Sequence, residues 1–240
     1  MGYAELHCRS NFSFLTGASH PEHLVEVAGS LGLDALAMTD RNGVYGIVRF
    51  AEAARAIGLP TVFGVEIDCG SFGEIVLLSR GASGYGPMVR AVSEGQLAGK
   101  KGAPVFMVDA IAHRVNQQCV VLTGGYGGAV VRALTDHGPS VAESTLRQLV
   151  ESFGRDNVLV ELWDHGDPID AVRNDQLVHI AYRVGVECVA TNNVMYAVPA
   201  QHRVATALAA VQNRCGLDEI DYRLPPAATA YLRSEAEMHR

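Results

Sequence analysis

Apolar runs of strand length alternate along the chain with amphipathic segments of helical length. Short continuous apolar runs predict buried strands, and apolar residues spaced three and four positions apart predict helices. The expected strands cover 5–9, 33–39, 60–67, 74–79, 119–123, 157–163 and 187–191, and the expected helices cover 19–31, 44–57, 85–97, 146–153, 169–184 and 201–213. This alternation favours parallel strands with helices outside, so we expect an α/β barrel or a doubly wound sheet.

Two local signals concern the connections between these elements. Ser19, followed by Pro21 and Glu22, marks a helix start, and we expect the Ser19 side chain to cap that helix. The segment 124–128 reads Gly-Gly-Tyr-Gly-Gly after an expected strand. It lacks the Lys-Ser/Thr of a P-loop and the spacing of a dinucleotide fingerprint, which favours a tightly packed turn over a nucleotide site.

Polar residues gather where the expected strands end. In the first strand Leu6 and Cys8 share one face, and the other face carries Glu5, His7 and Arg9. The later strand ends carry Asp40 with Arg41, Glu66 with Asp68, Asp164 with His165, and Asn193. Parallel barrels place their active sites at this face, so we expect a polar cavity there. A solvated surface pair is the alternative interpretation of His7 and its charged neighbour.

Composition narrows the class of protein. The 240 residues are 48% hydrophobic, which suits one globular domain with a substantial core, and the formal net charge of −7 argues against a domain that grips nucleic acid by itself. The five cysteines are scattered without a Cys-x-x-Cys pair, which suits a reducing cytoplasm and argues against a zinc ribbon or a disulfide framework. We see no leader sequence and no apolar run of about 20 residues, so we expect a cytoplasmic protein with no membrane partner.

Several motifs resemble those of the PHP (polymerase and histidinol phosphatase) domain. They are His-x-Arg-Ser-x-Phe-Ser-x-Leu-x-Gly at 7–17, Thr-Asp-Arg-Asn-Gly at 39–43, Gly-Val-Glu at 64–66, Glu-Leu-Trp-Asp-His-Gly at 161–166 and Ala-Thr-Asn-Asn-Val-Met at 190–195. Together with Tyr-Leu-Arg-Ser-x-x-Glu-Met at 231–238, they are similar to the N-terminal PHP domain of bacterial C-family DNA polymerases, the class of the polymerase III α subunit. The resemblance is closest to the error-prone, damage-inducible branch of that class.

The resemblance covers essentially the whole chain and has consequences for the fold. It implies a distorted (βα)7-type barrel, TIM-barrel-like, with parallel strands and outer helices. Residues 1–220 would form this barrel domain. Residues 221–240 would form a tail that leads towards a polymerase module and adds no element to the barrel.

Intact members of the family bind up to three divalent metals through His, Asp and Glu and hydrolyse phosphoesters. This chain departs from their pattern at Arg9, Thr16, Arg41, Glu74, Asn193 and Met195, where the family motifs have metal ligands. His7, Glu66 and His165 remain, and these three would hold zinc or manganese if any metal binds. Asp40 also keeps its place in the second motif.

Charge favours a site without metal. Arg9 and Arg41 cannot deprotonate at working pH, and a unit cation about 4 Å from another costs about 4 kcal/mol at an effective dielectric near 20. A divalent ion would roughly double this cost. We therefore expect that the two guanidinium groups replace the metal charge and pair with Asp40, Glu66 or Glu74, in a vestigial site with no catalytic residue and no cofactor.

The resemblance implies that the parent protein is an error-prone DNA polymerase, a nucleotidyltransferase used in damage-tolerant replication and repair. This domain would be a catalytically silent scaffold whose main partner is the remainder of the polymerase chain. DNA and a sliding clamp would be partners of the parent protein. Two alternatives stay open, namely an active metal-dependent phosphoesterase or 3′–5′ exonuclease, and a free-standing interaction module.

Overall fold

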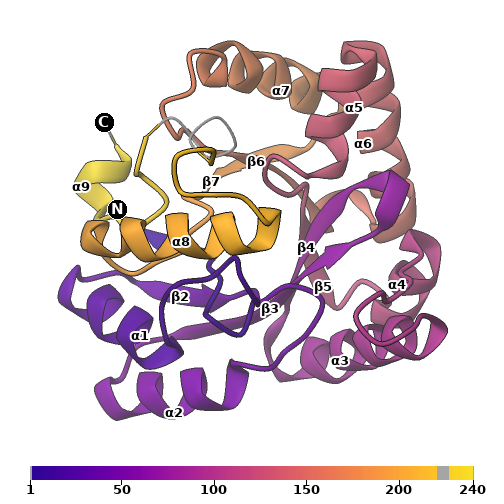
Figure 1. Cartoon of the computed structure of the whole chain (residues 1–240). Helices are drawn as coiled ribbons and strands as arrows, with labels where there is room; N and C mark the ends of the chain where they lie inside the picture. Colours follow the sequence, from indigo (N-terminus) through magenta and orange to yellow (C-terminus); the bar gives the residue numbers. More distant parts are fainter. Residues whose placement is uncertain (1, 221–226, 240) are drawn as a thin grey trace.

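The computed structural model describes residues 2–220 and 227–239, which fold around one seven-stranded sheet. The strands follow each other in chain order across the sheet, as β1 Ala4–Glu5, β2 Ala35–Met38, β3 Thr61–Asp68, β4 Glu74–Ser79, β5 Cys119–Leu122, β6 Val158–Leu162 and β7 Glu187–Ala190. The predicted α/β class is confirmed. Because the sheet curls and is surrounded by helices, the predicted barrel-like architecture is confirmed as well (Figure 1).

The expectation of parallel pairing throughout is wrong for β4. This strand runs antiparallel to both β3 and β5, whereas the other neighbouring strands are parallel. The connection from β3 to β4 holds only a short 3₁₀ turn, Gly70–Phe72, and a parallel crossover needs about a dozen residues or more. β4 therefore starts at the edge where the parallel strands end, and Glu74 reaches that edge as its first residue.

The helices lie outside the sheet. They are α1 Pro21–Ser30, α2 Ile47–Ile57, α3 Gly81–Ala98, α4 Val108–Val115, α5 Ala129–His137, α6 Pro139–Phe153, α7 Asp170–Val184, α8 His202–Asn213 and α9 Glu235–Met238. The sequence patterns missed α4 and α9, which are short. Ser19 does not cap α1, because its hydroxyl donates to Gln201 and accepts from the amide of Ala197, and His20 takes the N-cap position.

The core has an inner and an outer part. Inside the curled sheet, small and aliphatic side chains meet, with Ala37, Val76, Leu78 and Leu122 fully or almost fully buried. Between the sheet and α3 to α7 lies a larger cluster around Ile67, Leu77, Leu146 and Leu149, and a further cluster joins α1 and α2 to β2. This packing fixes the strand ends that carry the polar side chains.

The sheet closes only loosely between β1 and β7. We expected the first strand to run to Arg9, but β1 is limited to Ala4–Glu5 and the chain then makes one isolated bridge, Cys8 to Val194. Two backbone hydrogen bonds support this bridge, from the Arg9 amide to the Val194 carbonyl at 2.9 Å and from the Val194 amide to the His7 carbonyl at 2.8 Å. The barrel is therefore distorted at this seam.

The C-terminal strap, which we define as residues 227–239, covers the seam. Ala230 and Leu232 are buried, and the Met195 amide donates to the Ala230 carbonyl at 2.9 Å. The described part of the tail thus packs against the barrel. Residues 221–226 lie outside the described residues, so a domain boundary at 220 stays a prediction. No described helix has the length and apolar character needed to span a membrane.

Candidate functional site

Glu66 forms the centre of a buried charge network at the end of β3. Its Oε2 atom accepts a hydrogen bond from Arg9 Nε at 2.9 Å, a second one from Arg9 Nη2, and contacts His7 Nε2 at 2.8 Å. All three side chains are buried. One carboxylate thus holds a guanidinium group and an imidazole that reach it from the first motif.

Arg41 forms the outer part of this network. Its Nη1 atom lies 2.8 Å from Glu74 Oε1 and 3.8 Å from Glu66 Oε1, and its Nη2 atom donates to Asp68 Oδ2 at 2.9 Å. Arg41 is about one-third exposed, at 34%. The reversed direction of β4 brings Glu74 here, and the predicted pairing of Arg9 and Arg41 with Glu66 and Glu74 is present.

Two further glutamates, which sequence reasoning did not select, complete the network. Glu161 on β6 contacts His7 Nδ1 at 2.7 Å and accepts the hydroxyl of Thr191. The carboxylate of Glu5 on β1 accepts hydrogen bonds from the backbone amides of His7 at 2.9 Å and Asn192 at 2.9 Å, so it bridges the seam. Each is an acidic residue at a fully buried strand position, which is the signal that could have identified it.

Asp40 does not pair with either arginine among the described side chains. Its carboxylate accepts the Ser10 amide at 2.8 Å, the Ser10 hydroxyl at 2.9 Å and the Ser13 hydroxyl at 2.7 Å. Burial raises the pKa of Asp40, and these hydrogen bonds oppose the rise. Asp40 therefore fixes the loop after β1 to the end of β2.

The other predicted site residues lie apart from this network. His165 Nδ1 forms a hydrogen bond with the Thr229 hydroxyl of the strap at 3.0 Å, and within the described residues His165 forms no hydrogen bond with His7 or Glu66. Asn193 has a positive φ of 43° and lies beside Gly125, where an added Cβ would meet its side-chain nitrogen at 2.5 Å. Met195 lines a different cavity, beneath α8.

The segment 124–128 is a turn that packs tightly. Gly124 has a φ of +83°, and a Cβ on Gly128 would come within 2.4 Å of the Thr123 carbonyl. A Cβ on Gly127 would come within 2.3 Å of a Glu74 carboxylate oxygen. The glycines are required by close packing around the start of β4, in agreement with the prediction from sequence.

Electrostatics fixes the protonation of the central groups. Burial lowers the pKa of His7, but the charge and hydrogen bond of Glu161 and the hydrogen bond of Glu66 outweigh it and raise this pKa to about 9. Burial raises the pKa of Glu66, but Arg9 and His7 outweigh it and hold this pKa well below its ordinary value. At neutral pH His7 is an imidazolium with both nitrogens protonated, and Glu66 is ionised.

These groups do not fit a divalent metal. A histidine ligand must offer a nitrogen lone pair, and both nitrogens of His7 contact carboxylate oxygens that favour its protonated form. The buried Glu66 Oε1 and Glu161 Oε2 lack hydrogen-bond partners among the described residues, yet the Arg41 guanidinium already lies 3.8 Å from Glu66 Oε1. No group of three His, Cys, Asp or Glu side chains in the described ranges is arranged to hold an ion. The guanidinium groups of Arg9 and Arg41 lie beside Glu66, the carboxylate that such an ion would need.

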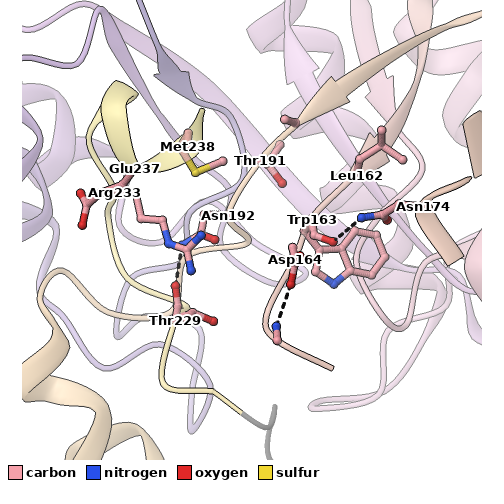
Figure 2. Close-up of a pocket in the computed structure, with 12 residues that line it drawn as sticks. Leu162, Trp163, Asp164, Asn174, Thr191, Asn192, Thr229, Arg233, Glu237 and Met238 are labelled. Atoms are coloured by element: carbon pink, nitrogen blue, oxygen red, sulfur yellow. Dashed lines mark hydrogen bonds between the residues drawn. The ribbon is translucent and has the colours of Figure 1, made fainter. Parts of the chain in front are cut away.

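A cavity of about 390 Å³ lies beside the network, between the ends of β6 and β7, α7 and the strap. Figure 2 shows Trp163 and Asn174 on one side of it and Arg233 and Glu237 on the other. Asn192 ties its floor to the strap by donating to the carbonyls of Thr229 at 2.6 Å and Tyr231 at 2.7 Å. The backbone amide of Asn192 donates a hydrogen bond to Glu5, so Asn192 links the cavity to the charge network.

Comparison with known polymerases relates the whole chain to one group. It is 45% identical to the error-prone DNA polymerase of Cutibacterium acnes, over 98% of this chain and 22% of that protein. It is 42% identical to the error-prone DNA polymerase of Mycobacterium tuberculosis H37Rv, over 100% of this chain and 23% of that protein. The chain thus spans less than a quarter of the length of these relatives.

Solved structures agree with the fold. A protein from Bifidobacterium adolescentis, assigned as a metal-dependent phosphoesterase, superposes with a TM-score of 0.60 at 17% identity, over 80% of this chain and 87% of that one. An amidohydrolase from Chromobacterium violaceum gives a TM-score of 0.57 at 17% identity, over 81% and 88%. The family model described as the PHP domain matches residues 5–165, and the chain belongs to the PHP domain family.

Proposed function

We propose that this chain is the PHP domain of an error-prone DNA polymerase and acts there as a metal-free, catalytically inactive scaffold. The observation that carries the proposal is the Glu66 centre, where Arg9 and His7 occupy the carboxylate that a metal would need. A barrel whose polar face is held by ion pairs keeps its shape without coordination. Its task is then mechanical, to support the polymerase portion of the parent chain.

The context of the parent protein rests on similarity. The relatives named error-prone DNA polymerase are more than four times as long as the aligned region, so their nucleotidyl transfer belongs to a protein of that length. We propose the same for the parent of this chain, with DNA and a sliding clamp as its partners and the cytoplasm as its location. The polymerase remainder is the direct partner of the domain itself.

The main alternative is a working metal-dependent phosphoesterase or 3′–5′ exonuclease. It draws on the assigned activity of the Bifidobacterium protein, whose 17% identity supports a shared fold alone. Such an enzyme needs a metal-bound or base-activated water. His7, with a pKa of about 9, is a poor general base at neutral pH, and His165 bonds to the strap.

An activity assay separates these functions. The purified chain is incubated with manganese or zinc and either single-stranded DNA or a simple phosphomonoester, beside His7→Ala and Glu66→Ala variants. We expect the same background turnover in all three proteins. Turnover by the wild type that both variants abolish contradicts the proposal. DNA synthesis by the longer chain that contains this sequence, measured on a primed template, distinguishes a polymerase domain from a free-standing module.

A further inference from the structure

Helix α8 packs unlike the other long helices of the described chain. Only one of its twelve residues, Ala210, is buried, whereas α1 buries four of ten and α7 buries six of fifteen. A helix of this length is marginal in water by itself and depends on packing for its stability. Figure 1 shows α8 apart from the ring formed by α1 to α7.

The inner side of α8 does not supply that packing. A cavity of about 170 Å³ separates the helix from the loop after β1 and from the strap, and small residues such as Ala205 and Ala209 line it. Across the cavity lie Leu15, Met195 and Ala230. A polar contact at this side, between the Tyr196 hydroxyl and His202 Nδ1, spans 3.3 Å. Among the described residues, α8 therefore borders a cavity on its inner side and buries little of its own surface there.

The outer side of α8 carries an apolar stripe, which we define as Val204, Ala207, Leu208 and Val211. Val204 is 49% exposed and Val211 is 62% exposed. Their spacing of seven residues, with Ala207 and Leu208 between them, is the anchor pattern of a helix that lies in a partner's groove. The stripe thus has the form of a surface to be covered.

The charges at the two ends of the stripe restrict the partner. Arg203 and Arg214 are exposed, and neither forms an ion pair with another described residue. In a symmetric pair of α8 helices, parallel or antiparallel, arginine of one copy would meet arginine of the other, which disfavours a second copy as partner. Two arginines on a chain of net charge −7 are also a weak attraction for nucleic acid.

We propose that the α8 stripe docks onto the polymerase portion of the parent chain, in an apolar groove bordered by carboxylates. This inference rests on the proposed function, since it names the surface through which the scaffold acts. The polymerase relatives extend over more than four times the length of the aligned region, so a parent protein of that length has a large further portion that can cover the stripe. Covering the stripe would bury the two valines and neutralise the two arginines.

The test compares Val204→Asp/Val211→Asp in the 240-residue chain and in the longer polymerase chain that contains it. Both valines are already exposed, so the melting temperature of the 240-residue chain is expected to change little. In the longer chain, limited proteolysis between the domain and the polymerase portion is expected to accelerate at least about tenfold, because two buried anchors are lost. Arg203→Glu/Arg214→Glu is expected to act in the same direction.

A matched control uses exposed valines on other helices. Val48→Asp/Val172→Asp changes side chains that are 67% and 60% exposed on α2 and α7, and no acceleration is expected. Equal proteolysis of wild type and Val204→Asp/Val211→Asp overturns the inference, as does acceleration by the control. A 240-residue chain that dimerises until Val204 and Val211 are changed, measured by sedimentation, overturns it in favour of a second copy. A wild-type longer chain that makes no DNA contradicts instead the proposed function.

Discussion

Replacing Glu66 by glutamine removes the central charge of the site while keeping its shape. Glutamine has nearly the same volume, and its carbonyl oxygen still accepts hydrogen bonds. Arg9 and protonated His7 would then be buried cations without their shared carboxylate. Glu66→Gln therefore isolates the electrostatic contribution on which the metal-free account depends.

The expected loss of stability is large. At an effective dielectric near 20, a charge pair separated by 2.9 Å contributes about 6 kcal/mol of Coulomb energy, and desolvation of the charges offsets much of it. Removing one partner of a buried pair typically costs about 3–5 kcal/mol, because the other charge stays buried. For a domain of this size, that corresponds to a fall in melting temperature of roughly 6–20 °C.

Urea unfolding at pH 7 measures this loss. Trp163 is the single tryptophan of the chain and is buried, so its fluorescence reports unfolding without added probes. We expect a lower midpoint with an unchanged dependence of the free energy on urea concentration. The matched control is Glu22→Gln, since Glu22 pairs with Arg49 at the surface with 40% of its side chain exposed. That change is expected to cost less than about 1 kcal/mol.

A small loss of stability in Glu66→Gln would contradict this reasoning. A Glu66→Gln protein within about 1 kcal/mol of wild type, at the same urea dependence, would mean that the central charge does little to hold the barrel mouth. A loss no larger than that of Glu22→Gln would carry the same meaning.

Three further predictions concern His7, Arg173 and Asn192. The pKa of His7 is raised to about 9 from an ordinary value of 6.5, so the stability that protonated His7 gives the folded state is fully present below pH 6.5 and is lost as pH rises through 9. Urea unfolding at a series of pH values should show this decline in the free energy of unfolding. A His7→Gln protein whose free energy of unfolding declines equally would contradict the prediction. The Arg173 guanidinium carbon lies 4.2 Å from the centre of the Trp163 ring, and Arg173 also forms an ion pair with Asp170. Arg173→Lys should therefore lower the free energy of unfolding by about 1–3 kcal/mol. An unchanged urea midpoint would count against this prediction. Asn192→Ala should speed hydrogen exchange in 227–233 more than elsewhere, and a uniform increase would refute a local link to the strap.

Much of the fold follows from the sequence because the strands are short apolar runs. Val158–Leu162 and Cys119–Leu122 lie within one or two residues of their predicted ranges. The direction of β4 was missed because strand patterns do not encode direction. The connection after Asp68 is too short for a crossover, and loop length was the overlooked clue.

The candidate site was predictable in its central residues and less so at its edges. Arg9, Arg41, Glu66 and Glu74 meet because they stand at the polar ends of neighbouring strands. Glu161 was missed because a single acidic residue in an apolar strand gives no periodic signal. His165 lies after β6, and its side chain is held by a hydrogen bond to Thr229 of the strap. The strap has no recognisable strand or helix pattern before residue 235, so this contact could not be predicted.

The central proposal is that the guanidinium groups of Arg9 and Arg41 take the place of a metal charge beside Glu66, and a metal-dependent melt tests it most directly. The chain is stripped with chelator, then melted without metal and with excess zinc or manganese. A site filled at one thousand times its dissociation constant contributes about 4 kcal/mol, or roughly 8–16 °C for a domain of this size. We predict a change below about 2 °C for both metals, since both nitrogens of His7 already contact the carboxylates of Glu66 and Glu161. A rise of about 8 °C or more that His7→Ala removes would contradict the account.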